Sequence, residues 1–350
     1  MSVICPAYNH EQYIGKLIHS ILNQTEQDFE AIIVDDCSKD RTPEVVESFA
    51  DDRIKLIRNK FNRGLNANIN TALEAATGDF LTYIGSDDMF FNTHFEVMTK
   101  YLEQHPDTDV VYCWLQPIDE NGNKHPYYDD SAPFSSAREE ALREMFYKRS
   151  VFPCPGMTMR RSALQKICPL PPAVANYQDC MMHIWLLMNG DFHQLPEPLV
   201  YYRRHEGNLS ANDLIPFTRS RYEISALMDA FLKMSADQIR QVFPAELNDL
   251  KLTVTDENKS FVLGMLALRA DDECRRLWGY SQIIDAVNKN ERELHDTCGY
   301  DYKFLLGLTG EIVNRFHQIE LHKNERGWFE KFFYRMYRHL EKKRMKRTRR

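Results

Sequence analysis

Short apolar runs and amphipathic stretches alternate along the first half of the chain. The runs are rich in β-branched and aromatic residues, which is typical of buried strands. Between them, apolar residues recur at every third or fourth position, which indicates helices. Strands alternating with helices predict an α/β fold with a mostly parallel central sheet flanked by helices. We expect strands at residues 3–5, 29–34, 54–57, 80–84 and 110–114, helices at 11–23, 42–50, 65–76 and 93–104, and a loop at 6–9.

The pattern changes in the second half. Asn121-Gly122 predicts a hairpin turn, and residues 126–156 predict a loop that contains one short helix. From about residue 212 onward the periodicity is helical throughout. We therefore expect a first domain at residues 1–212, an all-helical domain at 213–325 and a basic amphipathic helix with a tail at 326–350. The expected elements are helices at 138–147, 178–189, 217–234, 236–243, 259–270, 273–288, 304–317 and 328–345, and strands at 157–160 and 199–203.

Composition is that of an ordinary globular protein. Hydrophobic residues make up 43% of the 350 residues and charged residues 27%. No apolar run approaches the roughly 18 residues of a membrane span. Val3-Ile4-Cys5 already reads as a core strand, with no basic region before it, so we expect no signal peptide. The eight cysteines include no C-x-x-C pair, which makes zinc and redox motifs unfavoured and predicts reduced thiols in the cytoplasm.

Charge is distributed unevenly. The net charge is −7, yet the last twenty residues contain ten Lys or Arg and one Glu. Aromatic and apolar residues from Trp328 to Leu340 fall on one face of the final predicted helix. A basic helix with an aromatic face suits an anionic membrane surface, so we expect peripheral attachment at the inner face of the cell membrane. Two alternatives stay open: the aromatic face packs on the helical domain, or the tail binds nucleic acid, for which no base-reading motif is present.

Two polar loops follow the first two predicted strands. In the first, Tyr8 could stack on a nucleotide base and Asn9 could bond a ribose or a uracil edge. In the second, Asp35-Asp36 could accept the imino proton of uracil. Each loop alone is equally compatible with ordinary turn and helix-capping chemistry.

Two further loops carry carboxylates. Asp87 and Asp88 follow the strand at 80–84, at the strand end where open α/β sheets bind ligands. Adjacent carboxylates there suit Mg²⁺ or Mn²⁺, which need only one or two protein ligands beside phosphate oxygens. Asp179 begins the predicted helix at 178–189, where it could deprotonate an acceptor hydroxyl or cap the helix.

In combination these motifs are more specific. Tyr8-Asn9, Asp35-Asp36, Gly85-Ser86-Asp87-Asp88 and Gln178-Asp179, followed by Leu195 to His205, resemble family 2 glycosyltransferases over about residues 2–212. The resemblance implies the GT-A fold, a Rossmann-like sheet, and transfer with inversion at the anomeric carbon. It also implies a role for each matching residue: Pro6, Tyr8 and Asp36 at the base of the nucleotide sugar, with Asn9 beside them, Asp87 at the ribose or diphosphate, Asp88 at the Mn²⁺ or Mg²⁺, Asp179 as the catalytic base and His205 near the diphosphate or metal.

Two positions depart from the family pattern. Many members have a further acid where Gly85 stands, and many have Arg before Asn where this chain has Ile69-Asn70. The first departure removes one acid from the site. The second means that a phosphate contact is either missing or supplied by another residue, for example Arg63 or His205. Neither changes Asp88 or Asp179, so we expect activity.

The sequence thus predicts a cytoplasmic, metal-dependent, inverting glycosyltransferase. It would move a sugar from a nucleoside diphosphate, with UDP favoured, to a glycan or lipid-linked acceptor in surface polysaccharide or lipopolysaccharide synthesis, and would not bind nucleic acid. A sugar nucleotidyltransferase would require a Gly-rich, basic phosphate loop after the first strand, which residues 6–9 do not provide. A non-catalytic nucleotide-sugar-binding or scaffold protein remains an alternative.

Overall fold

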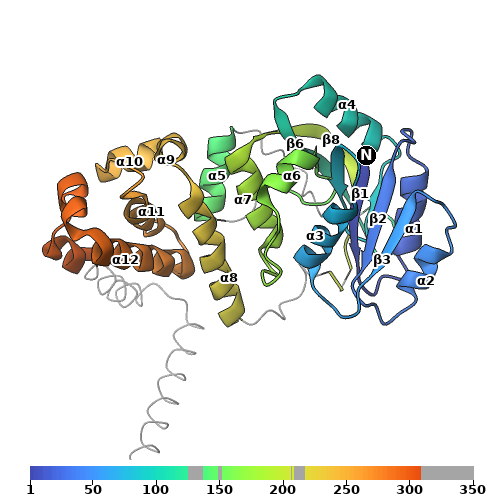
Figure 1. Ribbon diagram of the computed structural model, residues 1–350, viewed down its shortest axis with the longest axis horizontal. Coiled ribbons are helices and arrows are strands. Elements are labelled where there is room, and N and C mark those ends of the chain that lie inside the picture. Colours follow the sequence, from blue (N-terminus) through green and yellow to red (C-terminus); the bar gives the residue numbers. More distant parts are fainter. Residues whose placement is uncertain (125–136, 149–151, 206, 209–216, 309–350) are drawn as a thin grey trace, which may run out of the picture. The chain divides into compact units, whose positions relative to one another are not determined.

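The computed structural model describes residues 1–124, 137–148, 152–205, 207–208 and 217–308 (Figure 1). The chain forms two compact units, Met1–Val287 and Asn288–Arg350. The expected boundaries at residues 212 and 325 stay predictions. The basic segment at 326–350 lies outside the described residues, as does most of the helix expected at 304–317.

The described part of the first unit contains one sheet of eight strands in the order β3-β2-β1-β4-β7-β6-β8-β5. Four pairings are parallel, namely β1 with β2, β1 with β4, β2 with β3 and β6 with β8. The pairings of β7 with β4 and β6, and of β5 with β8, are antiparallel. The strands are β1 (Ser2–Ala7), β2 (Glu30–Asp35), β3 (Ile54–Arg58), β4 (Phe80–Tyr83), β5 (Met89–Phe90), β6 (Thr108–Ile118), β7 (Thr158–Arg160) and β8 (Asp191–Arg203).

Helices cover this sheet, and a helical region follows it in the chain (Figure 1). Helix α3 packs on β1 and β2, α4 on β6 and β7, and α7 on β8. The helices are α1 (Ile14–Leu22), α2 (Thr42–Glu47), α3 (Leu65–Ala75), α4 (His94–Gln104), α5 (Arg138–Tyr147), α6 (Arg161–Ile167), α7 (Gln178–Asn189), α8 (Phe217–Asp229), the 3₁₀ helix η2 (Ala230–Lys233), α9 (Ala236–Val242), α10 (Pro244–Leu250), α11 (Lys259–Ala267) and α12 (Glu273–Cys298). Helix α12 is interrupted at Asn290, which has non-helical φ and ψ angles of −153° and 62°.

The core explains why the apolar runs are continuous. Strand β2 is buried at five of its six positions because helices cover both faces of the sheet. Helix α1 contributes Ile14, Leu17, Ile18 and Ile21 to the same core. These residues recur at helical spacing, as the sequence predicted.

Several elements differ from expectation. Pro6 and Ala7, expected in a loop, continue β1, because its parallel pairing with β2 extends to Ala7 opposite Asp35. Strand β8 begins at Asp191 instead of Leu199, and its register with β6 shifts beside Pro198. A β-bulge accommodates the prolines that conceal this strand in the sequence. The short elements β5, α6 and α10 were not predicted. The turn at Asn121-Gly122 is confirmed, since Gly122 has a φ of 98° and Ile118 pairs with Lys124.

Candidate active site

Antiparallel pairing brings the end of β8 to the two acids that follow β4. Met89 lies opposite Tyr201 and Phe90 opposite Val200. Continuing this register places Asp87 and Asp88 beside the residues that end β8. Residues about 115 positions apart in the chain therefore meet, as the 2.8 Å hydrogen bond from the Arg203 backbone N–H to Asp88 Oδ1 shows.

A His-Asp-His cluster forms around Asp87. His205 Nε2 lies 3.0 Å from Asp87 Oδ2, and Asn208 Nδ2 lies 3.3 Å from the same oxygen. The His10 ring comes from the segment after β1, and its centroid is 5.9 Å from that of His205. His10, Asp87 and His205 each offer one ligand atom within 4.8 Å of the other two. Two imidazoles and a carboxylate form a donor set that fits Mn²⁺ and, less well, Mg²⁺.

Burial and neighbouring charges set the protonation of the two acids differently. Burial raises the pKa of Asp87, but the hydrogen bond from His205 and the positive potential of His10 outweigh it, so the pKa is below its usual value. Burial, followed by the charge of Asp87, holds the pKa of Asp88 well above its usual range. Asp87 is also the acid of the pair that lies within reach of both histidines.

Arg203 organises this region, and sequence analysis missed it. Its side chain is fully buried beneath the two acids. Nε donates to the Asp87 carbonyl at 2.8 Å, while Nη1 donates to the carbonyls of Asp119 and Glu120 at 3.1 and 3.0 Å. The guanidinium also lies 4.9 Å from the centroid of the Tyr13 ring. The only sequence signal was its position two residues before His205 in a Tyr-Tyr-Arg-Arg-His run.

Gly85 leaves room for the two carboxylates. A Cβ at this position would lie 2.8 Å from Asp87 Oδ1 and 3.3 Å from Asp88 Oδ2. Both acids therefore direct one oxygen toward Gly85. A side chain there would require the Asp87 carboxylate to move.

The predicted nucleotide-binding loops lie at the ends of β1 and β2 and are joined to each other. Asn9 has a φ of 54°, and its side-chain oxygen accepts from the Lys39 backbone N–H at 2.7 Å. Tyr8 is 42% exposed, whereas Pro6 is buried in β1. An exposed Tyr8 ring is therefore available for stacking on a ligand.

The Asp36 carboxylate is already bonded by its own chain. Oδ1 accepts from the Asn59 amide at 2.9 Å and from the Arg63 backbone N–H at 2.7 Å, and Oδ2 accepts from the Gly64 backbone N–H at 2.8 Å. Asp36 thus fixes the loop between β3 and α3. This geometry supports a positioning role, and the expected contact with the base stays a prediction.

Asp179 lies in the first turn of α7. Its Oδ1 accepts from the Cys180 backbone N–H at 2.7 Å, and burial raises its pKa. Burial first, and then neighbouring groups that include Asp179 and Asp87, hold the pKa of Tyr83 well above its usual range. Asp179 and Asp87 thus both contribute to the raised pKa of Tyr83, the last residue of β4, and the role of Asp179 as the base stays a prediction.

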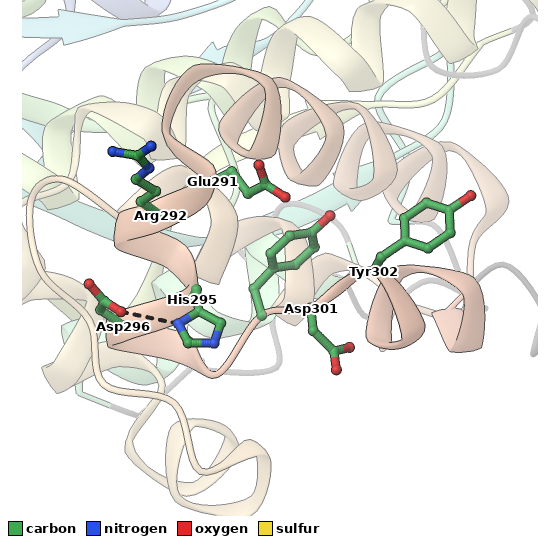
Figure 2. A pocket seen from close by; sticks show the side chains of 7 residues that line it. Glu291, Arg292, His295, Asp296, Asp301 and Tyr302 are labelled. Carbon is green, nitrogen blue, oxygen red and sulfur yellow. Dashed lines mark hydrogen bonds and ion pairs between the residues drawn. The ribbon is translucent and has the colours of Figure 1, made fainter.

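Two cavities lie elsewhere in the described part of the chain. One of about 420 Å³ occurs in the second unit, where His295 Nδ1 contacts Asp296 Oδ1 at 3.1 Å (Figure 2). Another of about 280 Å³ is bounded by α5, α10 and residues 269–271. Neither includes a predicted site residue. The site is therefore identified by its side-chain chemistry at the strand ends and not by cavity size.

Comparison with known proteins agrees with this fold. The glycosyl transferase family 2 model matches residues 2–168, which confirms the resemblance over that part of the expected residues 2–212. An uncharacterized glycosyltransferase from Methanocaldococcus jannaschii is 32% identical over 171 residues, which cover 48% of this chain and 58% of the relative. One from Nostoc is 26% identical over 294 residues, which cover 81% and 88%. The chain thus spans less than two thirds of the first of these relatives.

Among solved structures, S. aureus TarS residues 1–349 in complex with UDP superposes with a TM-score of 0.57 at 20% identity, covering 86% of this chain and 92% of TarS. TarS has also been solved in complex with UDP-GlcNAc. This likeness confirms the GT-A fold class. The family match ends before Asp179 and His205, so the roles of these two residues stay predictions.

Proposed function

We propose that this chain is an inverting glycosyltransferase of family 2 that uses a nucleoside-diphosphate sugar, because the glycosyl transferase family 2 model matches residues 2–168. The observation that carries the proposal is the meeting of Asp87 with His10 and His205 just after the end of β4. Ligands of open α/β sheets bind at such strand ends.

UDP is the favoured nucleotide. The structural relative TarS binds UDP and UDP-GlcNAc. On this chain the exposed Tyr8 ring would stack on the base, with Asn9 beside it and Pro6 shaping the loop from within β1. Asp36 would hold the loop at residues 59–64 against the nucleotide.

Asp87 and His205 would hold the divalent cation, Mn²⁺ or Mg²⁺. The expectation from sequence assigned the metal to Asp88, but Asp88 Oδ1 accepts from the Arg203 backbone N–H, whereas Asp87 lies within reach of both histidines. The proposal therefore gives the direct contact to Asp87 and places Asp88 behind it. When bound, the cation would neutralise charge that grows on the leaving diphosphate.

Asp179 would act as the general base. Its raised pKa gives the carboxylate more basicity than an ordinary aspartate, which suits proton abstraction from an alcohol. The acceptor oxygen would form a bond to the anomeric carbon as the bond from that carbon to the diphosphate breaks. The acceptor proton would pass to Asp179, and the configuration would invert.

Asp179→Asn tests this role. The substitution removes the base but retains an oxygen for the Cys180 N–H, so UDP release from a panel of UDP-sugars with Mn²⁺ should fall about 10²- to 10⁴-fold. UDP affinity, measured by calorimetry, should stay within about twofold. Asp191→Asn, at the exposed start of β8, is the matched control and should release UDP at the wild-type rate. Wild-type release by Asp179→Asn would contradict the assignment.

A non-catalytic nucleotide-sugar-binding protein is the second candidate, favoured by the missing acid at Gly85. If this candidate is correct, the wild type binds UDP but releases no UDP from any UDP-sugar on the panel.

The acceptor and the cellular location are proposed from the sequence. A glycan or lipid-linked acceptor and peripheral attachment at the cytoplasmic leaflet fit the basic segment at 326–350, which lies outside the described residues. Within the part of the chain that the structure describes, we find no helix with the length and apolar character needed to cross a bilayer.

A further inference from the structure

His10 meets Asp87 and His205 although nothing in the sequence singled it out. It comes from the segment between β1 and α1, almost two hundred residues before His205. Its nearest ligand atom lies within 4.8 Å of those of Asp87 and His205. Three chain segments therefore each contribute one donor to the same small volume.

The spacing suits one ion. A cation with bonds of about 2.1 Å places adjacent ligand atoms about 3 Å apart and opposite ones about 4.2 Å apart. The 3.0 Å between Asp87 Oδ2 and His205 Nε2 is the adjacent spacing. All three ligand atoms lie within 4.8 Å of one another, which is only about half an ångström more than the spacing of opposite ligands. Rotation of the side chains can close this difference.

The His10 ring is held for such a role. Its backbone N–H donates to Thr42 Oγ1 at 2.8 Å, which fixes the main chain. Ring atom Nδ1 lies 2.7 Å from Ser86 Oγ, and Ser86 is buried. When Ser86 accepts the proton of Nδ1, the lone pair of Nε2 is left for a ligand. Metal-binding histidines are commonly oriented by such a contact on their second nitrogen.

His205 is held differently. The Gly207 backbone N–H donates to its Nδ1 at 3.1 Å, so the ring proton sits on Nε2 and faces Asp87. A cation bound through Nε2 must displace this proton, whereas His10 can offer Nε2 without changing its bond to Ser86. His10 is therefore the better prepared nitrogen donor of the two.

We propose that His10 is a protein ligand of the divalent cation, together with Asp87 and His205, and that these two imidazoles make the site select Mn²⁺ over Mg²⁺. Imidazole nitrogen favours transition metals, whereas Mg²⁺ favours oxygen ligands and retains its waters. The inference rests on the proposed function in one respect: the cation would bind the diphosphate of the donor. Binding of the cation itself can be measured without any turnover.

The experiment uses the full chain, stripped of metal and titrated with Mn²⁺ alone while free Mn²⁺ is followed by electron paramagnetic resonance. His10→Ala should weaken Mn²⁺ binding at least tenfold and change Mg²⁺ binding much less, so the preference for Mn²⁺ should fall. Pulsed spectra should show coupling to two imidazole nitrogens in the wild type and to one in His10→Ala. His19→Ala, on the exposed side of α1, is the matched control and should retain both the affinity and the two-nitrogen signal.

Unchanged Mn²⁺ affinity and an unchanged nitrogen signal in His10→Ala would overturn the proposal. His10→Gln, which preserves a polar side chain of similar reach, covers the case in which the alanine variant does not fold, and it should also lose one nitrogen coupling. The outcome is separable from that of the proposed function. Loss of Mn²⁺ binding without any UDP release by the wild type would support the ligand role and reject the transferase. UDP release by the wild type, together with unchanged Mn²⁺ binding by His10→Ala, would support the transferase and reject the ligand role of His10.

Discussion

Adjacent residues can have opposite roles, as Asp87 and Asp88 show. Both follow β4, yet Asp87 faces two histidines while Asp88 accepts from the backbone of Arg203. The difference comes from the tight turn in which the Asp88 N–H donates to the Gly85 carbonyl at 3.2 Å. A sequence shows two acids in a row but not which one the turn directs toward the ligand.

Arg203→Lys tests the buried arginine at the residue scale. A lysine has no planar fork and cannot reach the carbonyls of Asp87, Asp119 and Glu120 together. Each buried carbonyl left without a donor costs about 1–3 kcal/mol, so we expect the free energy of unfolding to fall by about 3 kcal/mol. We also expect weaker Mn²⁺ binding, because the Asp87 backbone loses its anchor.

Urea unfolding and Mn²⁺ titration measure the two effects. Arg58→Lys, at an exposed ion pair on β3, is the control and should change neither by more than a few tenths of a kcal/mol. Equal stability of Arg203→Lys and Arg58→Lys would show that the buried network contributes little.

At the element scale, sequence patterns predicted the bounds of two helices but shortened strand β8. The expected helices at 138–147 and 178–189 have the observed bounds of α5 and α7. Strand β8 is much longer than expected, because Pro196 and Pro198 interrupt its pattern and a register shift accommodates them. Helical periodicity depends on one segment alone, whereas a strand is defined by its partner.

Gly156→Ala tests how closely the segment before β7 packs against the side chains of β6 and β8. Gly156 precedes β7 with a φ of 79°, and a Cβ there would overlap Val200 Cγ2 and lie 3.1 Å from Cys113 Sγ. Strain from the positive φ adds to the overlap, so we expect a loss of about 3 kcal/mol or more in the free energy of unfolding.

Gly122→Ala is the matched control for the backbone effect. Gly122 also has a positive φ, of 98°, but a Cβ there would meet nothing within 4 Å. The free energy of unfolding of Gly122→Ala should fall by about 1–2 kcal/mol. Similar losses for both variants in thermal or urea unfolding would show that close packing at Gly156 is unimportant.

For the whole molecule, two buried histidines couple stability to pH. Burial lowers the pKa of His94 and of His183 to about 3. The unfolded chain takes up protons at these residues below a pH of about 6.5, and the folded chain does not, so stability is lost as the pH falls from about 6.5 toward 3. The loss is at most about 1.4 kcal/mol per pH unit for each histidine.

His183→Gln should make the pH dependence of the unfolding free energy shallower than in the wild type between pH 6.5 and 5. Comparing slopes is necessary because Asp88, with its raised pKa, acts in the opposite direction. His105→Gln, at an exposed position, is the control. A slope for His183→Gln that matches the wild type would contradict the assignment.

The sequence by itself determined the alternation of strands and helices, the polar loops at the strand ends and the resemblance to family 2 glycosyltransferases. These depend on the order of residues within short segments, which local propensity and periodicity express directly. Only the tertiary structure decided that Asp87 and not Asp88 meets His205, that His10 joins them, and that Arg203 lies buried beneath them. Those contacts join residues more than seventy positions apart, and strand register and turn direction, which no local pattern encodes, determine which side chains meet.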